Sequence, residues 1–316
     1  MLSPGEWPSG HHLNIVSVNN FPTAAGLASS AAGYAALMYA LCQLFGIDDA
    51  ARISTLARLG SGSACRSLYG GFVQWVAGAD HATSTARQLL GEAGWPSMRV
   101  LVLVVSDHRK DTSSTAGMAL TVQTSPLMAH RAAAVVPGRV REMAAAIASR
   151  DFDAFARLTM ADSNQFHAVC ADTYPPIRYM NDVSWSVVSL VHRLNSSSIN
   201  SSGSKGGAAL VAYTFDAGPN ACLYLLEEAV PTVLAALNAA YAPKKEKGET
   251  QLEVKGIQHQ QKVKLNKEMA DHAAAVARPG ALKYVISTKL GPGPQVLTRA
   301  LGDEVSLMAA DGLPKL

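Results

Sequence analysis

Hydrophobic positions recur along the chain with two different periods, and the change of period separates predicted strands from predicted helices. Alternating or continuous apolar runs predict strands at residues 12–18, 68–76, 99–106, 208–215, 221–226 and 283–289. Helical spacing predicts helices at residues 28–45, 49–59, 126–135, 137–150, 153–170 and 181–194, and another that ends near residue 241. The Ser/Asn/Gly tract 195–207 reads as a solvent loop, and the polar segment 244–267 as a mobile connection. This order of elements predicts an α+β protein in two parts.

Composition narrows the class of protein. The 316 residues are 48% apolar and 16% charged, which is enough for two ordinary hydrophobic cores and predicts two domains. A net charge of +3 is too small to indicate a nucleic-acid partner. The longest apolar stretches suit buried strands rather than membrane spans, and the first residues lack the pattern of a secretory signal. Four scattered cysteines without a C-x-x-C pair argue against a disulfide framework or a zinc site and for a reducing compartment.

The sharpest chemical signal is the run of small residues PTAAGLASSAAG at residues 22–33, where a helix begins. Small residues let the backbone approach an anion closely, and a helix start presents free N–H groups and the positive end of its dipole. The hydroxyls of Ser29 and Ser30 add donors, so the stretch suits a polyphosphate, although it lacks the Gly-Lys-Ser/Thr ending of a Walker loop. A helix start packed tightly against a sheet is an equally good interpretation of the composition alone.

Two charged residues follow patterns that suit catalysis. Arg66 stands in the small-residue stretch 60–71, where its planar guanidinium would grip a carboxylate and Ser61 and Ser63 would add hydroxyl bonds. From the residues alone, the more common explanation of Arg66 is an arginine that caps the turn before a strand. Asp216 lies between an apolar strand and Gly-Pro, a place where loops display functional groups, although an Asx-turn aspartate looks the same in sequence.

A third polar run follows the buried strand 99–106. Lys110, Ser114 and Thr115 would suit a diphosphate group at a strand end, and they would equally suit a capped helix. Asn164 and His167 lie one turn apart on a predicted helix, and a structural pair is the better interpretation because no metal-ligand spacing surrounds them.

Several of these stretches together resemble the mevalonate-diphosphate decarboxylase family of the GHMP kinase superfamily. The similar stretches occur in the family's order at residues 19–34, 60–71, 162–168, 213–220, 291–294 and 311–315. The resemblance implies an α+β, GHMP kinase-like fold, in which an incomplete ribosomal-protein-like domain with a left-handed βαβ unit (residues 1–97) binds ATP. A ferredoxin-like domain (residues 98–316) would follow it.

The resemblance also implies a reaction and a set of site residues. The reaction is the ATP-dependent decarboxylation of mevalonate 5-diphosphate to isopentenyl diphosphate, with Mg²⁺ bridging phosphates and no direct protein ligand to the metal. The implied catalytic residues are Asp216, Arg66 and Ser30. The implied ATP-binding residues are Asn20, Pro22, Ala24, Ala25, Gly26, Leu27, Ala28, Ser29 and Ser30. The implied substrate-binding residues are Ser61, Gly62, Ser63, Ala64, Cys65, Arg66, Lys110, Ser114 and Thr115.

The chain departs from the family pattern at its beginning, where the motif A-P-x-N-I-A-x-x-K-Y-W-G-K with its lysine is not found. We therefore expect a truncated gene model or splice form, or a chain that has lost activity. The alternatives are another small-molecule kinase of the superfamily, or an inactive form that pairs with full-length subunits. A homodimer in the cytoplasm is expected, without nucleic-acid or membrane partners. The carboxy-terminal Pro-Lys-Leu resembles a peroxisomal address only weakly.

Overall fold

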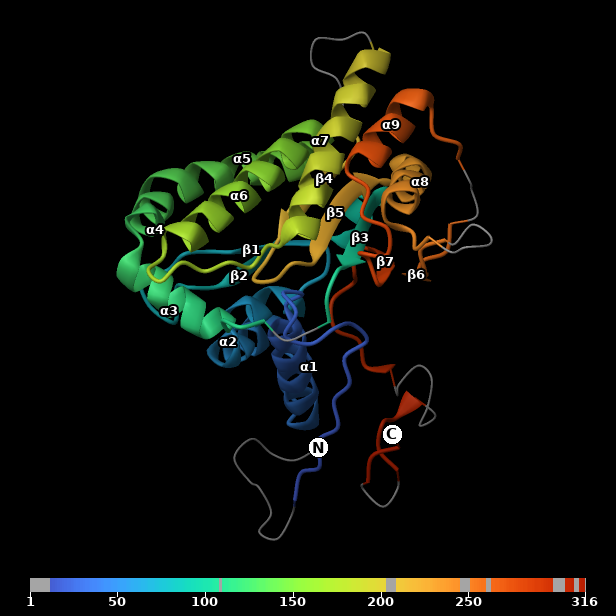
Figure 1. Cartoon of the computed structure of the whole chain (residues 1–316). Coiled ribbons are helices and arrows are strands. Elements are labelled where there is room, and N and C mark those ends of the chain that lie inside the picture. The colour runs from blue at the N-terminus through green and yellow to red at the C-terminus, as the bar shows by residue number, and fades with distance from the viewer. Residues whose placement is uncertain are drawn as a thin grey trace. The chain divides into compact units, whose positions relative to one another are not determined.

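A computed structural model of the chain describes residues 12–107, 110–202, 209–244, 251–259, 263–297, 305–309 and 313–315. Its internal contacts divide the chain into two compact units. The helices and strands of both are labelled in Figure 1. Unit 1 holds the amino-terminal part up to Gly94, except Ala24–Leu27, together with the segment from Gly291. Unit 2 holds Ala24–Leu27 and Trp95–Leu290. The predicted domain boundary at residues 97–98 stays a prediction, and contacts assign the segment after Leu290 to unit 1.

Unit 1 is built on two helices and a hairpin. Helices α1 (Ser29–Leu44) and α2 (Ala50–Gly60) are followed by a 3₁₀-helix, Gly62–Leu68. Strands β1 (Phe72–Trp75) and β2 (Ala86–Leu90) pair antiparallel. The helices pack through small and apolar side chains, and the buried members of this core are Ala31, Ala35, Cys42, Ile53, Ala57, Ala64 and Leu68.

Unit 2 is organised around a five-stranded sheet. Its strands are β3 (Met98–Val104), β4 (Ala212–Phe215), β5 (Ala221–Leu226), β6 (Val254–Gly256) and β7 (Tyr284–Lys289). They run in the order β4-β5-β3-β7-β6, and every pair is antiparallel except β6 with β7. In chain order, β3, β4, β5 and β7 reproduce the split βαβ arrangement of a ferredoxin-like domain. The prediction of a ferredoxin-like second domain is therefore confirmed.

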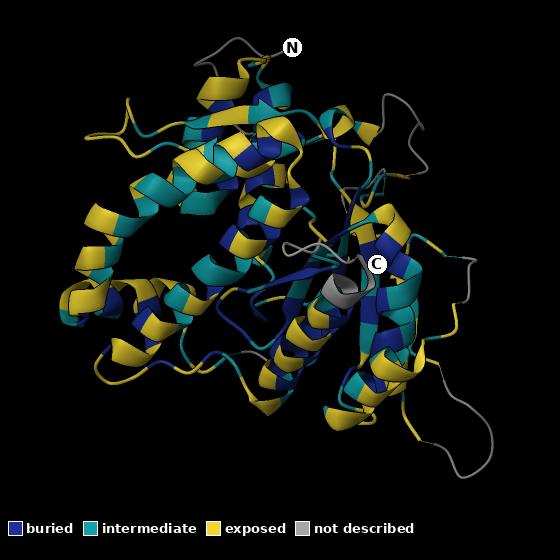
Figure 2. Ribbon diagram, turned by 90° about the horizontal axis from the view of Figure 1, so that it is seen from above, coloured by how far each residue is buried: buried dark blue, intermediate teal, exposed yellow. Residues whose placement is uncertain are grey.

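The helices of unit 2 form the rest of its core. They are α3 (Ser114–Thr124), α4 (Pro126–His130), α5 (Val136–Ser149), α6 (Phe152–Asp172), α7 (Asp182–Ser202), α8 (Val230–Tyr241) and α9 (Lys267–Ala275). A π-helical turn, Arg131–Val135, joins α4 to α5. Helices α7, α8 and α9 stand beside the sheet (Figure 1), and their buried residues share one core with those of the strands. Buried residues are dark blue in Figure 2. The largest side chains that are buried there are Leu101, Leu103, Leu190, Leu194, Tyr213, Leu223, Leu225, Leu237 and Tyr241.

Among the described helices, none combines the length and the apolar character that crossing a bilayer requires.

Three sequence predictions of secondary structure are wrong. Residues 12–18 form no strand, and Ile15 is 57% exposed. The tract 195–207 is not a loop from its start, because α7 continues to Ser202. Within α7, the hydroxyl of Ser196 donates to the backbone carbonyl of His192, which lets a serine remain in a helix. Residues 203–208 lie outside the described part.

The polar segment 244–267 is not simply the mobile connection that the sequence predicts, although its residues 245–250 and 260–262 lie outside the described part. It contributes the edge strand Val254–Gly256. A three-residue strand with one half-buried apolar position has no detectable alternation, so only its pairing with β7 reveals it. The sequence also missed α9, which begins after Asn266, whose side chain accepts a hydrogen bond from the amide of Met269.

An arginine pair binds α6 to the preceding helices. The guanidinium of Arg131 donates to both oxygens of Asp162, at 2.7 and 2.8 Å, and Arg139 donates to one of them at 3.0 Å. Burial by itself raises the pKa of the Asp162 carboxyl, but the two arginines outweigh that effect and hold the pKa below its usual value. The ionised aspartate therefore contributes to stability.

Replacing Asp162 by Asn is expected to lower the free energy of unfolding at pH 7 by about 0.5–1 kcal/mol. Two guanidinium groups lose their shared carboxylate, but that side chain is 44% exposed and solvent screens part of the attraction. The folded pKa is depressed, so this contribution is fully present above the unfolded pKa of about 3.9 and is lost as pH falls through the folded pKa. Denaturant unfolding at pH 7 measures the loss of stability, and the same experiment in acid measures how that loss decreases at low pH. Glu142→Gln, an equal charge change at an exposed position of α5, is the control. If the difference in unfolding free energy between wild type and Asp162→Asn stays constant as the pH falls, the ionised carboxylate of Asp162 is not the source of the stabilisation.

Candidate active site

The small-residue loop before α1 has an unusual backbone. Ala24, Gly26 and Ala28 have φ angles of 58°, 77° and 57°, all in the left-handed region. An alanine there costs about 1–2 kcal/mol, so tertiary contacts must hold the loop in this shape. The N-cap position of α1 is Ala28, which has no side-chain oxygen to accept a hydrogen bond from the first turn. The loop and helix start therefore fit a bound anion such as a phosphate.

Within unit 2, this loop packs on the loop that carries Asp216. A methyl group added at Gly26 would lie 2.7 Å from the Cα of Gly218, and one at Gly218 would lie 2.5 Å from the carbonyl oxygen of Ala25. The two backbones thus touch where neither residue has a side chain. Gly26 and Gly218 are needed for this approach, and no sequence pattern indicates that these two loops meet.

Asp216 presents an exposed carboxylate between buried neighbours. It follows β4 directly, Phe215 and Ala217 on either side are buried, and the amide of Gly218 donates to its backbone carbonyl at 2.7 Å. Buried flanks fix the position of the loop, while the carboxylate itself stays accessible. This arrangement suits a group that acts on a bound molecule rather than one that caps a turn.

Lys110 lies within electrostatic reach of Asp216. Its ammonium donates to the hydroxyl of Ser114 at 2.7 Å and lies 5.6 Å from the centre of the Tyr179 ring. Burial lowers the pKa of Lys110, and the charge of Asp216 opposes that shift. The predicted residues Lys110, Ser114 and Asp216 are therefore gathered in one region of unit 2.

Buried groups on α6 and after it complete this region, and the sequence had not singled them out as site residues. Burial first, and then the negative charge of Asp216, raise the pKa of the Cys170 thiol to about 11. Burial is also the main cause that raises the pKa of Tyr179 to about 12, with smaller effects from Cys170 and Asp216. Both groups stay protonated at neutral pH, so neither adds negative charge to this region.

The structure bears on one of the two interpretations of residues 110–115, the capped helix, while the diphosphate site stays a prediction. Ser113 caps α3, because its hydroxyl accepts a hydrogen bond from the amide of Ala116 at 3.1 Å. Ser114 turns its hydroxyl to Lys110 instead. Thr115 lies beside it in the first turn of α3. Ser113 thus caps the start of α3, and Ser114 accepts a hydrogen bond from Lys110.

The predicted residues of unit 1 gather around the 3₁₀-helix Gly62–Leu68. The hydroxyls of Ser30 and Ser61 lie 3.2 Å apart, which brings the start of α1 to the predicted substrate segment. A methyl group at Gly62 would lie 2.8 Å from the ring of Trp75, and the guanidinium of Arg66 lies 6.0 Å from the centre of the same ring. Arg66 is exposed, so its donors can reach a ligand.

Two members of the predicted substrate segment turn inwards. The side chains of Ala64 and Cys65 are buried in the core of unit 1, and the carbonyl of Cys65 accepts a hydrogen bond from the hydroxyl of Ser54 at 2.8 Å. Burial raises the pKa of the Cys65 thiol above its usual value. Ala64 and Cys65 therefore anchor the 3₁₀-helix that carries Arg66.

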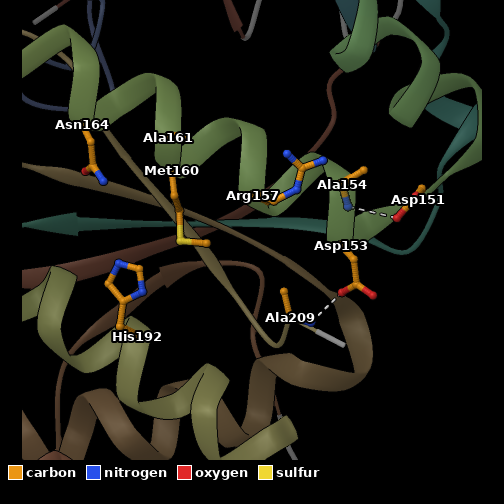
Figure 3. Close-up of a pocket in the computed structure, with 9 residues that line it drawn as sticks. All are labelled: Asp151, Asp153, Ala154, Arg157, Met160, Ala161, Asn164, His192 and Ala209. Atoms are coloured by element: carbon orange, nitrogen blue, oxygen red, sulfur yellow. Dashed lines mark hydrogen bonds between the residues drawn. The ribbon is translucent and has the colours of Figure 1, made fainter. Parts of the chain in front are cut away.

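A separate cavity of about 600 Å³ lies elsewhere in unit 2, between α6, α7 and the segment at Ala209 (Figure 3). None of the predicted catalytic or binding residues lines it. Asn164 and His192 face it, and the hydroxyl of Tyr213 donates to Asn164 at 2.9 Å and lies 3.2 Å from the ring nitrogen of His192. Asn164 has the hydrogen-bonded structural setting that the sequence predicted.

The strand order of unit 2 and the small-residue loop before α1 define a protein of the GHMP kinase type. Comparisons with known proteins narrow the class. A family model described as the mevalonate 5-diphosphate decarboxylase C-terminal domain matches residues 100–297. A diphosphomevalonate decarboxylase-like N-terminal domain model matches residues 5–86. The chain therefore belongs to the diphosphomevalonate decarboxylase family, whose members are ATP-dependent carboxy-lyases.

Individual relatives agree with this assignment. The human diphosphomevalonate decarboxylase is 50% identical over 305 residues, which cover 96% of this chain and 72% of the human protein. A crystal structure of a mevalonate 5-diphosphate decarboxylase matches with a TM-score of 0.72 at 41% identity, over 93% of this chain and 72% of that one. Another, MDDEF in complex with MVAPP, AMPPCP and magnesium, matches with a TM-score of 0.64 at 28% identity, over 86% and 68%.

Proposed function

We propose that Asp216, Arg66 and Ser30 carry the chemical steps of the family's reaction in this chain. The reaction converts mevalonate 5-diphosphate and ATP to isopentenyl diphosphate, ADP, phosphate and carbon dioxide. The observation that supports it best is the exposed carboxylate of Asp216, held between buried residues. It stands on a loop whose Gly218 packs on Gly26 of the small-residue loop Ala24–Leu27, which we call the phosphate loop. A carboxylate fixed beside a phosphate loop is what a hydroxyl-phosphorylating enzyme needs.

Asp216 would act on the tertiary hydroxyl of the substrate. Its carboxylate would accept the proton of that hydroxyl, or stabilise the hydroxyl electrostatically, while the hydroxyl oxygen attacks the terminal phosphoryl group of ATP. Lys110 adds positive charge near Asp216, and with Ser114 and Thr115 it would contact the substrate's phosphates. Phosphorylation turns a poor leaving group into a good one, so the later loss of phosphate needs less help from the protein.

Arg66 would hold the substrate carboxylate. Its guanidinium offers two parallel donors, and its place over Trp75 restricts the directions that the side chain can take. In the second step the C–O bond to the new phosphate breaks and phosphate leaves with that electron pair. The bond to the carboxylate also breaks, its electrons form the new C=C double bond, and carbon dioxide is released. Arg66 would keep the carboxylate in position for this step. The hydroxyls of Ser61 and Ser63 would add hydrogen bonds to the same end of the substrate.

The start of α1 and the loop before it would bind ATP. Residues 24–28 supply a strained, side-chain-poor backbone, and Ser29 and Ser30 supply hydroxyls at the first turn. ATP supplies the phosphoryl group, and Mg²⁺ neutralises its charge when both are bound. Within the described ranges, no cluster of three or more His, Cys, Asp and Glu side chains is placed to hold a metal ion. As the family resemblance implies, phosphates rather than protein carboxylates would provide the main ligands of Mg²⁺.

The decisive experiment follows both products of the 316-residue chain supplied with ATP, Mg²⁺ and mevalonate 5-diphosphate. We expect carbon dioxide and ADP in equal amounts, because the two steps are coupled on one substrate. ADP without carbon dioxide would instead identify a small-molecule kinase of the same superfamily. Binding of both ligands without turnover would support the alternative of an inactive form that pairs with full-length subunits.

Assembly and location follow from the resemblance alone. We propose a homodimer in the cytoplasm, with the peroxisome as the alternative location. Cross-linking and sedimentation of the purified chain would test the first, and a fluorescent fusion that leaves the carboxy-terminus free would test the second.

A further inference from the structure

The amide side chain of Asn220 is buried at a junction of three segments. Only 1% of the residue is exposed. Its Oδ1 accepts hydrogen bonds from the amides of Val105 at 2.7 Å and Ser106 at 3.0 Å. Its Nδ2 donates to the carbonyls of Ala25 and Ser106, both at 2.8 Å. Two accepted and two donated bonds are the full capacity of an asparagine side chain.

The partners belong to distant parts of the chain. Ala25 is in the phosphate loop, and Val105 and Ser106 follow β3. Asn220 itself closes the loop that begins at Asp216. The bonds therefore tie the phosphate loop, the end of the central strand and the catalytic loop to one side chain, all within unit 2.

A second set of contacts joins the phosphate loop to the same region of unit 2. Gly26 touches Gly218 through the backbone, and the amide of Lys110 donates to the carbonyl of Ala24 at 3.4 Å. Ala24–Leu27 belongs by its contacts to unit 2, although the residues on both sides of it belong to unit 1. Ala24, which is strained at φ 58°, needs such contacts to keep its conformation.

We propose that Asn220 is a positioning residue for the phosphoryl-transfer step, and this rests on the function proposed above. By bonding the Ala25 carbonyl, it holds the phosphate loop at a fixed place against the loop of Asp216. The phosphoryl donor and the catalytic carboxylate then meet without a further rearrangement, which is how rigid supports contribute to rate.

The chemistry of the junction requires an amide. Two of the four partners are N–H groups and two are carbonyls, so the side chain must both accept and donate. An aspartate keeps the acceptor bonds but turns a carboxylate towards the carbonyls of Ala25 and Ser106. Asn220→Asp therefore removes the link to the phosphate loop while leaving the volume of the side chain almost unchanged.

The chain provides a matched control in Asn195. Its Oδ1 accepts hydrogen bonds from the amides of Leu210 and Val211, and its Nδ2 donates to the carbonyl of Val211. Asn195 is thus another asparagine of unit 2 whose side chain both accepts and donates hydrogen bonds to the backbone. Its partners, however, lie just before β4 and not in the phosphate loop. Asn195→Asp damages the fold in a similar way and leaves the proposed link intact.

The first measurement is the affinity for AMPPCP with Mg²⁺, by titration calorimetry, together with kcat. We expect Asn220→Asp to weaken nucleotide binding and to lower kcat, each by about tenfold or more, because one lost buried hydrogen bond has effects of that size. Asn195→Asp should change nucleotide affinity by less than about twofold. Equal effects of the two variants would overturn the proposal, because they would show a general loss of stability.

The second measurement does not depend on activity. Hydrogen exchange of the unliganded chain should show faster exchange of the Lys110 amide in Asn220→Asp, because its acceptor on Ala24 is no longer held. Asn195→Asp should leave that amide as protected as in wild type, and equal protection in all three proteins would overturn the proposal. If wild type binds no nucleotide, the proposed function fails, and the exchange result still decides whether Asn220 positions the loop.

A third variant covers the case in which Asn220→Asp does not fold. Gly218→Ala leaves the amide in place but puts a methyl group 2.5 Å from the carbonyl oxygen of Ala25. It should displace the same loop and weaken nucleotide binding by a similar factor. Unchanged affinity in Gly218→Ala would contradict the view that this junction positions the phosphate loop.

Discussion

Replacing Asp216 by Asn is expected to lower kcat by about 10²–10⁴-fold while nucleotide binding changes little. The amide has nearly the shape of the carboxylate, so the loop should keep its buried neighbours and its contact with Gly26. It cannot accept a proton at neutral pH, and it has no negative charge to stabilise the attacking hydroxyl. Steady-state kinetics and a nucleotide titration on the same preparation separate the two effects.

The control for this variant is Asp271→Asn, which removes the same charge from an exposed position of α9. It should leave turnover at the wild-type level. If Asp216→Asn retains most of its activity, Asp216 has no part in the chemical step. The loss of its charge should also lower the pKa of Lys110 further, because Asp216 now opposes the effect of burial on that ammonium.

Replacing Arg66 by Lys is expected to lower kcat/KM for mevalonate 5-diphosphate by about 10–100-fold, because an ammonium cannot form the two parallel bonds of a guanidinium. The positive charge is kept, so the loss reports geometry rather than net charge. Nucleotide affinity should stay unchanged, because Arg66 is assigned to the carboxylate end of the other substrate. Titrations with each ligand separately measure the difference.

Arg87→Lys is the matched control in unit 1. Arg87 is exposed on β2 and donates two hydrogen bonds to Gln74, at 2.9 and 3.1 Å, without belonging to the predicted substrate segment. Its replacement should have no effect on the affinity for either substrate. A similar loss in both arginine variants would show that general positive charge, and not a carboxylate contact at Arg66, supports substrate binding.

Regular periodicity made the larger elements predictable. The prediction of a helix at residues 28–45 differs from α1 by one residue at each end, and β5 has the predicted bounds, residues 221–226. Each of these segments is recognisable from its own residues, because apolar positions repeat along it. A helix end is recognisable too where a residue such as Gly46 follows, since its φ of 69° suits only a glycine well. Short elements such as β6 carry no such signal, because three residues do not define a period.

The site was predictable in its chemistry but not in its arrangement. Small residues, an arginine and a loop aspartate were recognisable because each chemical role demands a particular residue type. The sequence gives Asn220 no distinguishing pattern, since its Nδ2 bonds a carbonyl 195 positions away. Such a contact exists only after β3 and β5 have paired and brought their ends together.

For this protein, the sequence by itself determined the helices and strands with strong periodicity, the small-residue loop that suits a phosphate, and the family that its ordered motifs resemble. Only the tertiary structure decided the strand order of the sheet, the extension of α7 beyond residue 195, and the junction of Ala25, Gly26 and Gly218 with Asn220. The physical reason is range. Propensity and periodicity act over a few residues, whereas backbone approach and buried hydrogen bonds depend on segments that the folded chain alone brings together.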